Sequence, residues 1–332
     1  LEIQREWTEQ LKKCDEVELY IIKSTVIIAG TCTGFVSNRI IRDVEFDYVI
    51  VDEAAKATFP ELAVSLNKAH KIILVGDHQQ LPPVLDTEII RNNKEKLDEE
   101  GLAQGIFERM YNMFPEDNKH RLTIQYRMHP TIGTLISHVF YNDEIQNGVE
   151  AQDRELCIEG YEGIAIEWIS TSKYSTKERY EKEFDNNGKK SCQNYLERNI
   201  IERKLLELDS KLVKRTKVAV ITGYGSQKYI LQTMVKQHSF KHIEVDVDTV
   251  DAFQGSQKDI ILYSTVRSSG NKYGIGFLKS EARINVAFSR ARCLLIIVGD
   301  MKFLDNYKIR GNKFPEIIKY ITESEGCRII EK

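Results

Sequence analysis

Hydrophobic and polar residues follow one another along this chain in blocks that predict strands and helices in turn. Short continuous runs rich in Val, Ile and Leu occupy residues 25–29, 48–51, 71–75, 217–222, 259–265 and 294–298. Runs without a polar face are typical of strands that are buried on both sides of a parallel sheet. Between them, residues 194–208 place Leu196, Ile200, Leu205 and Leu208 at near-helical spacing, which predicts a helix with a solvated charged face. The pattern predicts an α/β protein.

The same pattern predicts two stacked α/β domains. A new series of strands follows residues 112–118, so we expect a first domain of residues 1–113 and a second of residues 114–332. Two polar segments interrupt the pattern. Residues 91–100 predict an exposed loop or short surface helix, and residues 170–190 predict a loop that leaves the second sheet.

Composition places the chain among ordinary folded proteins. It has 332 residues, of which 42% are hydrophobic and 29% charged, which excludes a disordered, collagen-like or membrane-embedded chain. The net charge of −3 does not by itself indicate a nucleic-acid partner. Acidic residues are in excess in the first 120 residues and basic residues in the rest, which permits a basic groove or scattered surface charge alike.

The six cysteines predict free thiols in a reducing compartment. They are far apart, without a C-x-x-C pair or zinc spacing, and no apolar run reaches the length of a membrane span. The first residue is Leu1 and no signal peptide follows it. We therefore expect a fragment of a longer protein, located in the cytoplasm, or in the nucleus if the source is eukaryotic.

Acidic and amide side chains follow two neighbouring predicted strands. Asp52 and Glu53 come directly after the run in YVIVDEAAKA, and Gln80 follows KIILVGD and precedes a rigid Pro82-Pro83 turn. An aspartate at a strand end can hold hydrated magnesium, and the adjacent carboxylate can deprotonate a water that attacks a phosphate. For Asp52 and Glu53, the alternative is an ordinary strand-to-helix turn with a capping carboxylate. For Gln80, the alternative is a turn with a purely structural role.

Arginines with aromatic or helical neighbours occur later in the chain. LTIQYRMHP offers the Tyr126 ring beside the Arg127 cation, as a base and a phosphate require. RINVAFSRARCLL places Arg283, Arg290 and Arg292 along a predicted short helix, with Arg283 and Arg290 seven residues apart on one face. The alternatives are a buried tyrosine with a surface arginine, and a solvated basic helix.

The segment VDTVDAFQGSQKDIILYSTVRS predicts a strand, a turn and a second strand. Gly255 in the turn allows a close backbone approach to a ligand. Polar side chains that can contact backbone phosphates or relay the state of a nucleotide surround an apolar frame here: Thr249, Asp251, Gln254 and Arg267.

Five strings in this order carry a family resemblance. VDEAAKA, VGDHQQLPP, QYRMHP, VDAFQGSQKD and INVAFSRAR resemble motifs II to VI of superfamily 1 helicases, in the branch of the nonsense-mediated-decay helicase and senataxin. The resemblance spans about residues 25–300. It implies two RecA-like domains with ATP in the cleft between them, single-stranded RNA or DNA across both, and 5′-to-3′ movement driven by alternating cleft closure.

The resemblance also implies roles for single residues. Asp52 would hold Mg²⁺ through water, Glu53 would be the general base, and Gln80 would sense the γ-phosphate. Tyr126 would lie near the adenine, and Arg127 and Arg290 would contact phosphate. Gly255 and Gln257 complete the expected nucleotide-binding set, although the family commonly has glutamate at Gln257. In TVIIAGTCTGF, Thr31 and Thr33 match threonines that contact the nucleic-acid backbone. The polar residues of the strand-turn-strand segment complete the expected nucleic-acid set: Thr249, Asp251, Gln254 and Arg267.

The pattern departs from the family in one serious respect. No glycine-rich Walker A loop ending in Gly-Lys-Ser/Thr precedes Asp52, and GTCTGF has no lysine. Gly223 also stands where the branch usually has proline. Without the loop, we expect this chain alone to bind ATP poorly and to be inactive. Truncation of a complete protein explains this more simply than true loss.

The sequence therefore supports one leading hypothesis, the motor portion of an ATP-dependent nucleic-acid helicase. The runner-up is a helicase-like module that binds nucleic acid or protein without ATP turnover. A small-molecule phosphotransferase is a third class, which would not need paired arginines from a second domain. The choice between RNA and DNA, protein partners in missing domains, and oligomeric state leave no signal in the sequence.

Overall fold

The computed structural model of the chain describes residues 2–11, 15–41, 44–83, 105–186, 189–253, 255–269, 274–305 and 311–331. The chain divides into two compact units, Leu1–His120 and Arg121–Lys332, and each has its own hydrophobic core. The division therefore falls after His120, a few residues beyond the expected boundary. The expected surface segment at residues 91–100 lies outside the described residues.

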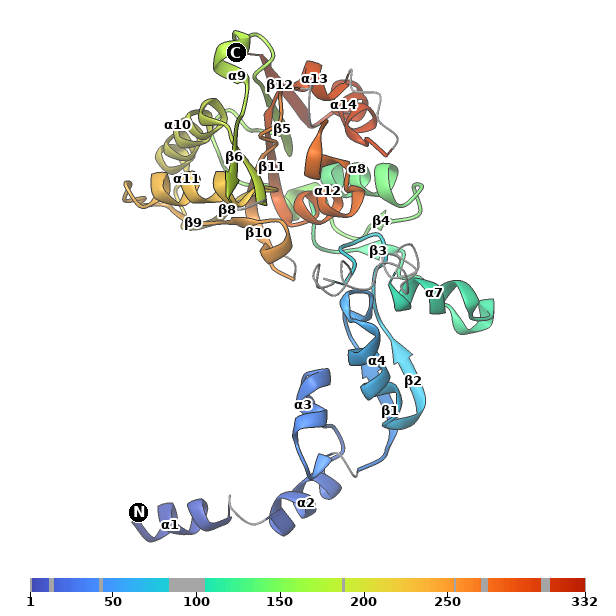
Figure 1. The fold of residues 1–332 in the computed structure, drawn as a ribbon. Helices are drawn as coiled ribbons and strands as arrows, with labels where there is room; N and C mark the ends of the chain where they lie inside the picture. Colours follow the sequence, from blue (N-terminus) through green and yellow to red (C-terminus); the bar gives the residue numbers. More distant parts are fainter. Residues whose placement is uncertain are drawn as a thin grey trace. The chain divides into compact units, whose positions relative to one another are not determined.

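The first unit is built on two paired parallel strands (Figure 1). β1 (Phe46–Val51) and β2 (Ala69–Leu74) pair in the register Val51↔Leu74, so both strands end at one edge. These strands confirm the predicted runs at residues 48–51 and 71–75. The helices of this unit are α1 (Glu2–Leu11), α2 (Asp15–Ser24), α3 (Cys32–Ser37), α4 (Phe59–Leu66) and α7 (Ile106–Met113), with short turns η2 (Ala54–Lys56) and η3 (Glu116–Asn118).

The connection between the two strands runs through α4, and its start is encoded locally. The Glu61 carboxylate accepts hydrogen bonds of 2.8 Å from both the N–H and the hydroxyl of Thr58, which satisfies the first turn of the helix. These bonds lower the pKa of Glu61. Leu62 of the same helix packs with Val51 and Phe107 in the core of this unit.

The strand predicted at residues 25–29 does not form, and this prediction is wrong. A strand needs hydrogen bonds to a neighbour, and within the described part of this unit the only paired strands are β1 and β2. Val26 and Ile27 are instead exposed, at 98% and 81%. The run is apolar, but it pairs with neither β1 nor β2.

The second unit contains a six-stranded sheet in which every strand is parallel to its neighbours. The strand order is β12-β5-β11-β10-β8-β9. The strands are β5 (Ile166–Ser170), β8 (Thr216–Thr222), β9 (Ile243–Thr249), β10 (Lys258–Ser264), β11 (Ala291–Gly299) and β12 (Cys327–Glu331). The predicted runs at residues 217–222, 259–265 and 294–298 are β8, β10 and β11, which confirms the α/β fold class.

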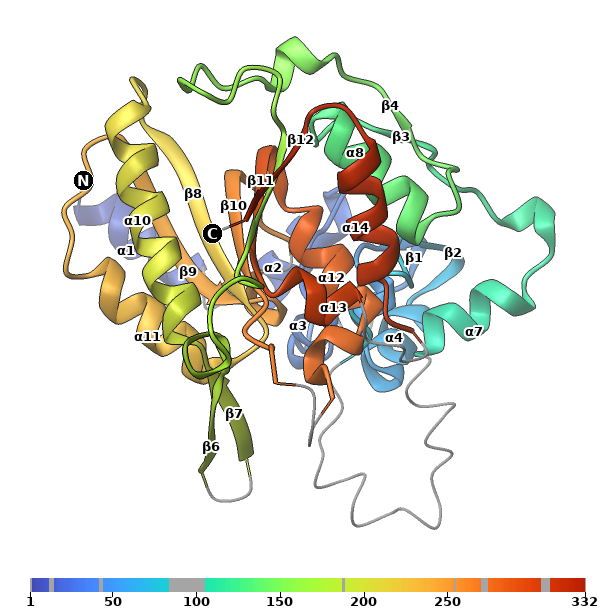
Figure 2. The ribbon, with the colours of Figure 1, turned by 90° about the horizontal axis from the view of Figure 1, so that it is seen from above.

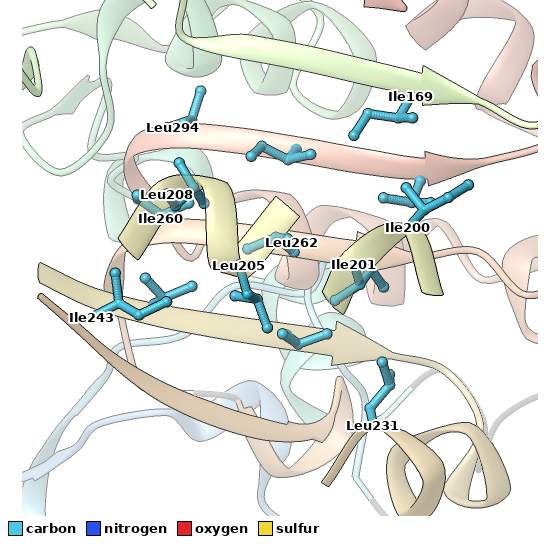
Figure 3. Packing of buried hydrophobic residues seen from close by; sticks show 14 of the residues in the cluster. Ile169, Ile200, Ile201, Leu205, Leu208, Leu231, Ile243, Ile260, Leu262 and Leu294 are labelled. Atoms are coloured by element: carbon cyan, nitrogen blue, oxygen red, sulfur yellow. The ribbon is translucent and has the colours of Figure 1, made fainter. Parts of the chain in front are cut away.

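Helices cover both faces of this sheet (Figure 2). On one face, α10 (Tyr195–Lys211) and α11 (Gly225–Val235) pack Ile200, Leu205 and Leu231 onto alternate residues of the strands (Figure 3). On the other face, Tyr263 of β10 contacts Phe288 in an edge-to-face pair. The helices of that face are α8 (Pro130–Phe140), α12 (Glu281–Phe288), α13 (Met301–Asp305) and α14 (Phe314–Glu323). The smaller elements are β3 (Ile124–Gln125), β4 (Gln146–Asn147), η4 (Ala151–Arg154), η5 (Asp251–Phe253) and η6 (Gly276–Lys279).

Helix α10 confirms the helix predicted at residues 194–208. It begins where the Asn194 side chain accepts the N–H of Glu197 at 3.0 Å. The prediction that its charged face is solvated is wrong for two residues. Glu197 is fully buried, and Lys204 is buried with its ammonium 3.2 Å from Glu167. Both charges have partners inside the protein.

Residues 170–190, predicted as a loop, contain regular structure. A short helix, α9 (Thr176–Arg179), precedes an antiparallel hairpin of β6 (Lys182–Asn186) and β7 (Lys189–Gln193) that projects from the body of the unit (Figure 2). Five described cysteines are free thiols, and Cys14 lies outside the described residues. Within the described part of the chain, no helix is both long enough and apolar enough to traverse a bilayer.

Candidate functional site

Asp52 and Glu53 lie at the carboxyl edge of β1, as the sequence predicts. The N–H of Glu53 donates to Asp52 Oδ1 at 2.9 Å, and the next N–H, of Ala54, donates to the carbonyl of Val75 at 2.8 Å. Both acidic residues are exposed. Glu53 has left-handed backbone angles, φ 55° and ψ 32°. This conformation costs a residue with a Cβ about 1–2 kcal/mol, and such outliers concentrate at functional sites.

Gln80 lies at the same edge, in the turn that follows β2. Asp77 holds this turn, because its Oδ2 accepts from Gln80 Nε2 at 2.8 Å and its Oδ1 accepts from the N–H of Gln79 at 3.0 Å. Gly76 permits the close approach of the two turns. A Cβ at this position would lie 2.7 Å from the backbone nitrogen of Ala55. The acidic pair and the Gln80 amide therefore lie on adjacent strand ends.

These two turns fit the terminal phosphate of a nucleotide and its metal ion. Mg²⁺ commonly takes one or two carboxylates and fills its remaining positions with water and phosphate oxygen, and Asp52 supplies such a carboxylate. Among the described residues, no group of three acidic, histidine or cysteine side chains forms a complete metal cage. The residues present do not fit the rest of the triphosphate, because the 332-residue sequence has no glycine-rich loop with its lysine.

Thr31 and Thr33 lie at the start of α3 and are exposed. The Thr31 hydroxyl accepts the N–H of Gly34 at 3.0 Å and lies 3.4 Å from the Thr33 hydroxyl. The first interaction caps the helix. Their expected contact with the nucleic-acid backbone stays a prediction.

Tyr126 and Arg127 lie in the loop after β3 in the second unit. The Gln125 side-chain carbonyl shapes this loop by accepting the N–H groups of Arg127 and Met128 at 2.9 and 2.8 Å. Tyr126 is exposed, whereas Arg127 is half-buried and donates from Nη1 to the carbonyl of Ser289 at 3.3 Å. The loop therefore reaches the residue that follows α12.

Arg290 is also next to Ser289, in a buried position. Its Nε donates to the carbonyl of Val286 at 3.1 Å, Nη1 to the carbonyl of Ser256 at 3.3 Å, and Nη2 to the Ser289 hydroxyl at 3.4 Å. Contact with a phosphate requires an exchange of some of these hydrogen bonds. The structure thus brings Arg127 and Arg290 together around one residue.

The prediction that Arg283 and Arg290 share one helical face is wrong. Helix α12 ends at Phe288, with Ser289 as its C-cap, so Arg290 lies beyond the helix. Arg292 lies further on, in β11, and pairs with Asp259 at 3.0 Å. The seven-residue spacing of Arg283 and Arg290 suggested a helix that includes both residues. The chain instead leaves the helix at Phe288 and enters the buried strand β11.

Gly255 and Gln257 flank Ser256, whose carbonyl accepts from Arg290. Both are exposed, and Gly255 has φ 82°, a conformation that favours glycine. The start of β10 is held close by, because the N–H of Lys258 donates to the carbonyl of Arg290 at 3.1 Å. Three of the ordered motifs therefore meet around Arg290.

Thr249 and Asp251 lie at the carboxyl end of β9. The N–H of Thr249 donates to Asp248 Oδ1 at 2.7 Å. Asp251 is exposed and pairs with Arg283 Nη2 at 3.1 Å, which links the segment after β9 to the start of α12. Gln254 lies outside the described residues.

Arg267 does not lie on the surface, where a direct contact with nucleic acid would require it. It is 2% exposed, and its Nη1 lies 3.1 Å from Glu181 and 3.0 Å from Glu183. Its Nη2 donates to the carbonyl of Gly274 at 2.7 Å. This environment favours a structural role, because the guanidinium is buried and its hydrogen-bonding and ion-pair partners belong to the same unit.

A buried polar network around Glu197 is the largest feature that the sequence did not reveal. The Glu197 carboxylate accepts from the hydroxyls of Ser264 at 2.6 Å and Thr265 at 3.2 Å, and from the N–H of Val266 at 2.9 Å. Val266 has φ 68°, a strained value for a β-branched residue. Burial raises the pKa of Glu197 to about 8, although these three bonds oppose the shift. The only sequence signal was an acidic residue three positions after a capping asparagine.

The parallel α/β sheet of the second unit and the ordered motif residues are features that this chain shares with the helicase class. The AAA domain family matches residues 2–88 and 102–302. This chain belongs to that family and, within it, to the superfamily 1 helicases of the nonsense-mediated-decay branch.

Curated relatives agree with this assignment. A regulator of nonsense transcripts 1 homolog of Drosophila melanogaster is 35% identical over 301 residues, 89% of this chain and 24% of its own length. The ATP-dependent helicase NAM7 of Saccharomyces cerevisiae is 34% identical over 324 residues, 96% of this chain and 31% of its own. The chain therefore spans about a quarter to a third of these relatives. A solved PRRSV helicase matches 76% of this chain and 34% of its own at 17% identity, with a TM-score of 0.36.

Proposed function

We propose that this chain carries the motor portion of an ATP-dependent helicase that moves along single-stranded nucleic acid in the 5′-to-3′ direction. The observation that carries the proposal is the placement of Asp52 and Glu53 beside the Asp77-held Gln80, on the adjacent ends of two paired strands. The family's ATP-dependent members support nucleotide use. The proposed direction of movement rests on the resemblance to the nonsense-mediated-decay branch alone.

The acidic pair would divide the chemistry of hydrolysis. Asp52 would hold Mg²⁺ through water, and the ion would neutralise charge on the terminal phosphates. Glu53 would orient a water and accept its proton, which an exposed carboxylate at the carboxyl edge can do without a rearrangement of the core. Gln80 would donate its amide toward the γ-phosphate, and Asp77 would keep that amide oriented.

The second unit would contribute positive charge to the nucleotide site. It would also contribute part of the track, meaning the surface along which the nucleic acid runs. We propose that Arg127 and Arg290 contact the phosphates of the bound nucleotide, with Tyr126 near the adenine and Gly255 and Gln257 in the same set. Charge stabilisation by such arginines is worth about 10³–10⁵ in rate in related phosphoryl-transfer enzymes. Thr31, Thr33, Thr249, Asp251 and Gln254 would contact the nucleic-acid backbone.

One observation favours a second candidate, a nucleic-acid-binding module without ATP turnover. The guanidinium of Arg290 is buried and already donates to two backbone carbonyls, so it is held within the unit. A module of this kind would keep the binding surface and would not need the general base.

ATPase measurements on the full-length protein separate the two candidates. We expect turnover that single-stranded RNA or DNA stimulates and that Glu53→Gln abolishes. Asp47→Asn is the matched control, since Asp47 is an exposed carboxylate on the same strand, β1, and should leave turnover unchanged. An absence of stimulated turnover in the wild type supports the binding module, and full turnover in Glu53→Gln removes the proposed base.

A further inference from the structure

The β6–β7 hairpin has two chemically different faces. Side chains of a strand alternate between faces, and Glu181 and Glu183 both point to Arg267, at 3.1 and 3.0 Å. Lys182 and Phe184 alternate with these glutamates and are exposed. The acidic side chains on either side of Lys182 therefore both pair with Arg267, Glu181 from a buried position and Glu183 from a partly exposed one. The face that carries Lys182 and Phe184 presents a cation and an aromatic ring.

The base of the hairpin is fixed to the sheet. The Ser191 hydroxyl accepts the N–H of Ser226 at 3.1 Å, and Gln193 Nε2 donates to the carbonyl of Ser226 at 3.1 Å. On the inner face, Cys192 is buried against Tyr224 and Val266. These contacts tie β7 to the start of α11 and to the segment after β10, so the hairpin projects from a rigid support.

The outer face continues onto the first residue of α10. The ammonium of Lys182 lies 5.4 Å from the centre of the Tyr195 ring, within the range of a cation–π contact. Phe184 is 41% exposed and Tyr195 48% exposed. Two exposed rings beside a lysine suit the stacked bases and the phosphates of a single strand.

The hairpin lies at the same edge of the sheet as the expected nucleic-acid contacts. Its anchor, Ser226, follows β8 by four residues, and β8 pairs with β9 in the register Thr222↔Thr249. β9 ends at Thr249, and Asp251 follows it at the same edge. A single strand of nucleic acid held at Thr249 and Asp251 would therefore lie at the carboxyl ends of β8 and β9, which is the edge from which the hairpin projects.

From these contacts we infer that Lys182, Phe184 and Tyr195 form an additional binding face for single-stranded nucleic acid. The rings stack on bases, and Lys182 contacts a phosphate. Recognition of this kind tolerates many sequences, because every base presents a flat face. This inference rests on the proposed function, since it extends the track of the same motor.

Equilibrium binding measures each part of this face. Fluorescence anisotropy with labelled oligouridine and oligothymidine is recorded for the full chain over a series of salt concentrations. We expect Phe184→Ala and Tyr195→Ala each to weaken binding about 5- to 100-fold with an unchanged salt slope. Lys182→Gln should reduce the slope of log K against log salt by about 0.7, the share of one phosphate contact on a single strand.

Matched variants distinguish this face from the rest of the surface. Tyr229→Ala and Lys236→Gln remove an exposed ring and an exposed lysine from the α11 region and should bind like the wild type. Phe184→Leu keeps an apolar side chain without the flat ring, so it should weaken binding as Phe184→Ala does. Circular dichroism checks that each variant is folded.

Three results would overturn the inference. Wild-type affinity and salt slope in all three face variants would remove the face from the track and leave the proposed function intact. Wild-type oligonucleotide binding by Phe184→Leu alongside loss in Phe184→Ala would show that an apolar side chain without a flat ring is sufficient, which would overturn base stacking at Phe184. A wild-type chain that binds neither oligonucleotide would contradict the proposed function and this inference together.

Discussion

Arg127 donates from Nη1 to the carbonyl of Ser289 at 3.3 Å, across 162 positions of sequence. The hydroxyl of the same serine accepts from Arg290. One residue at the end of α12 therefore touches both arginines that the resemblance assigns to phosphate. The side chains of the fourth and sixth motifs meet at a defined point inside the second unit.

Replacement of Arg290 by alanine should affect both turnover and stability. We expect nucleic-acid-stimulated ATPase of the full-length protein to fall by about 1,000-fold or more. The free energy of unfolding should fall by about 1–3 kcal/mol, because the buried carbonyl of Val286 and the partly buried carbonyl of Ser256 lose their donor. Steady-state kinetics and urea unfolding measure the two effects. Arg215→Ala, at an exposed arginine, should change neither, and turnover within tenfold of wild type in Arg290→Ala would argue against a phosphate contact.

Replacement of Gly76 by alanine should disturb the acidic turn. A Cβ 2.7 Å from the Ala55 nitrogen forces the ends of β1 and β2 apart. We expect a loss of about 1–3 kcal/mol of stability, as in overpacked sites, and a kcat reduced by up to about 100-fold through displacement of the catalytic groups. Gly225→Ala is the control, since a Cβ there meets nothing within 4 Å. Equal behaviour of the two variants in unfolding and kinetics would contradict the steric argument.

Replacement of Arg267 by methionine should act on stability. The change leaves Glu181 buried with an uncompensated charge, which typically costs about 3–5 kcal/mol. Arg283→Met removes a partly exposed ion pair with Asp251 and should cost no more than about 1 kcal/mol. Chemical denaturation of the two variants measures the difference. If the Arg267→Met protein were as stable as the wild type but bound nucleic acid more weakly, a direct contact between Arg267 and nucleic acid would be supported after all, against the argument from the burial of Arg267.

Glu197 should make stability depend on pH. Its folded pKa of about 8 lies above the ordinary value of 4.5, so the folded state binds more protons between these values. Its stabilising contribution is complete below about pH 4.5 and is lost as pH rises through 8. Glu197→Gln should remove this dependence, up to about 1.4 kcal/mol per pH unit. Urea unfolding between pH 5 and 9 tests this, with exposed Glu323→Gln as the control; parallel curves for wild type and Glu197→Gln would refute it.

The sequence predicted the strands that are buried on both faces. β8, β10 and β11 occupy the middle of the sheet, and their side chains are apolar on both sides, which leaves a continuous run. The strand predicted at the start of VDTVDAFQG covers only the end of β9, because β9 is an edge strand in which acidic residues alternate with apolar ones. β5 was missed because Glu167 interrupts it. That residue is buried only because Arg328 and Lys204, distant in sequence, pair with it.

The candidate site divides in the same way. The positions of Asp52, Glu53 and Gln80 followed from local strand ends, and the structure places them as expected. The surroundings of Arg290 and Arg267 did not follow, because Ser256 and Glu181, which hold them, are distant in sequence and the chain must fold before they meet. Packing made both arginines internal.

The left-handed backbone at Glu53 has a consequence for how this position responds to selection. Asparagine tolerates that geometry better than glutamate does, so a change to asparagine would relieve strain while removing the proton acceptor. Selection for heat resistance alone would therefore tend to discard Glu53. Its retention in a thermally selected library would report that turnover, rather than folding, had been under selection.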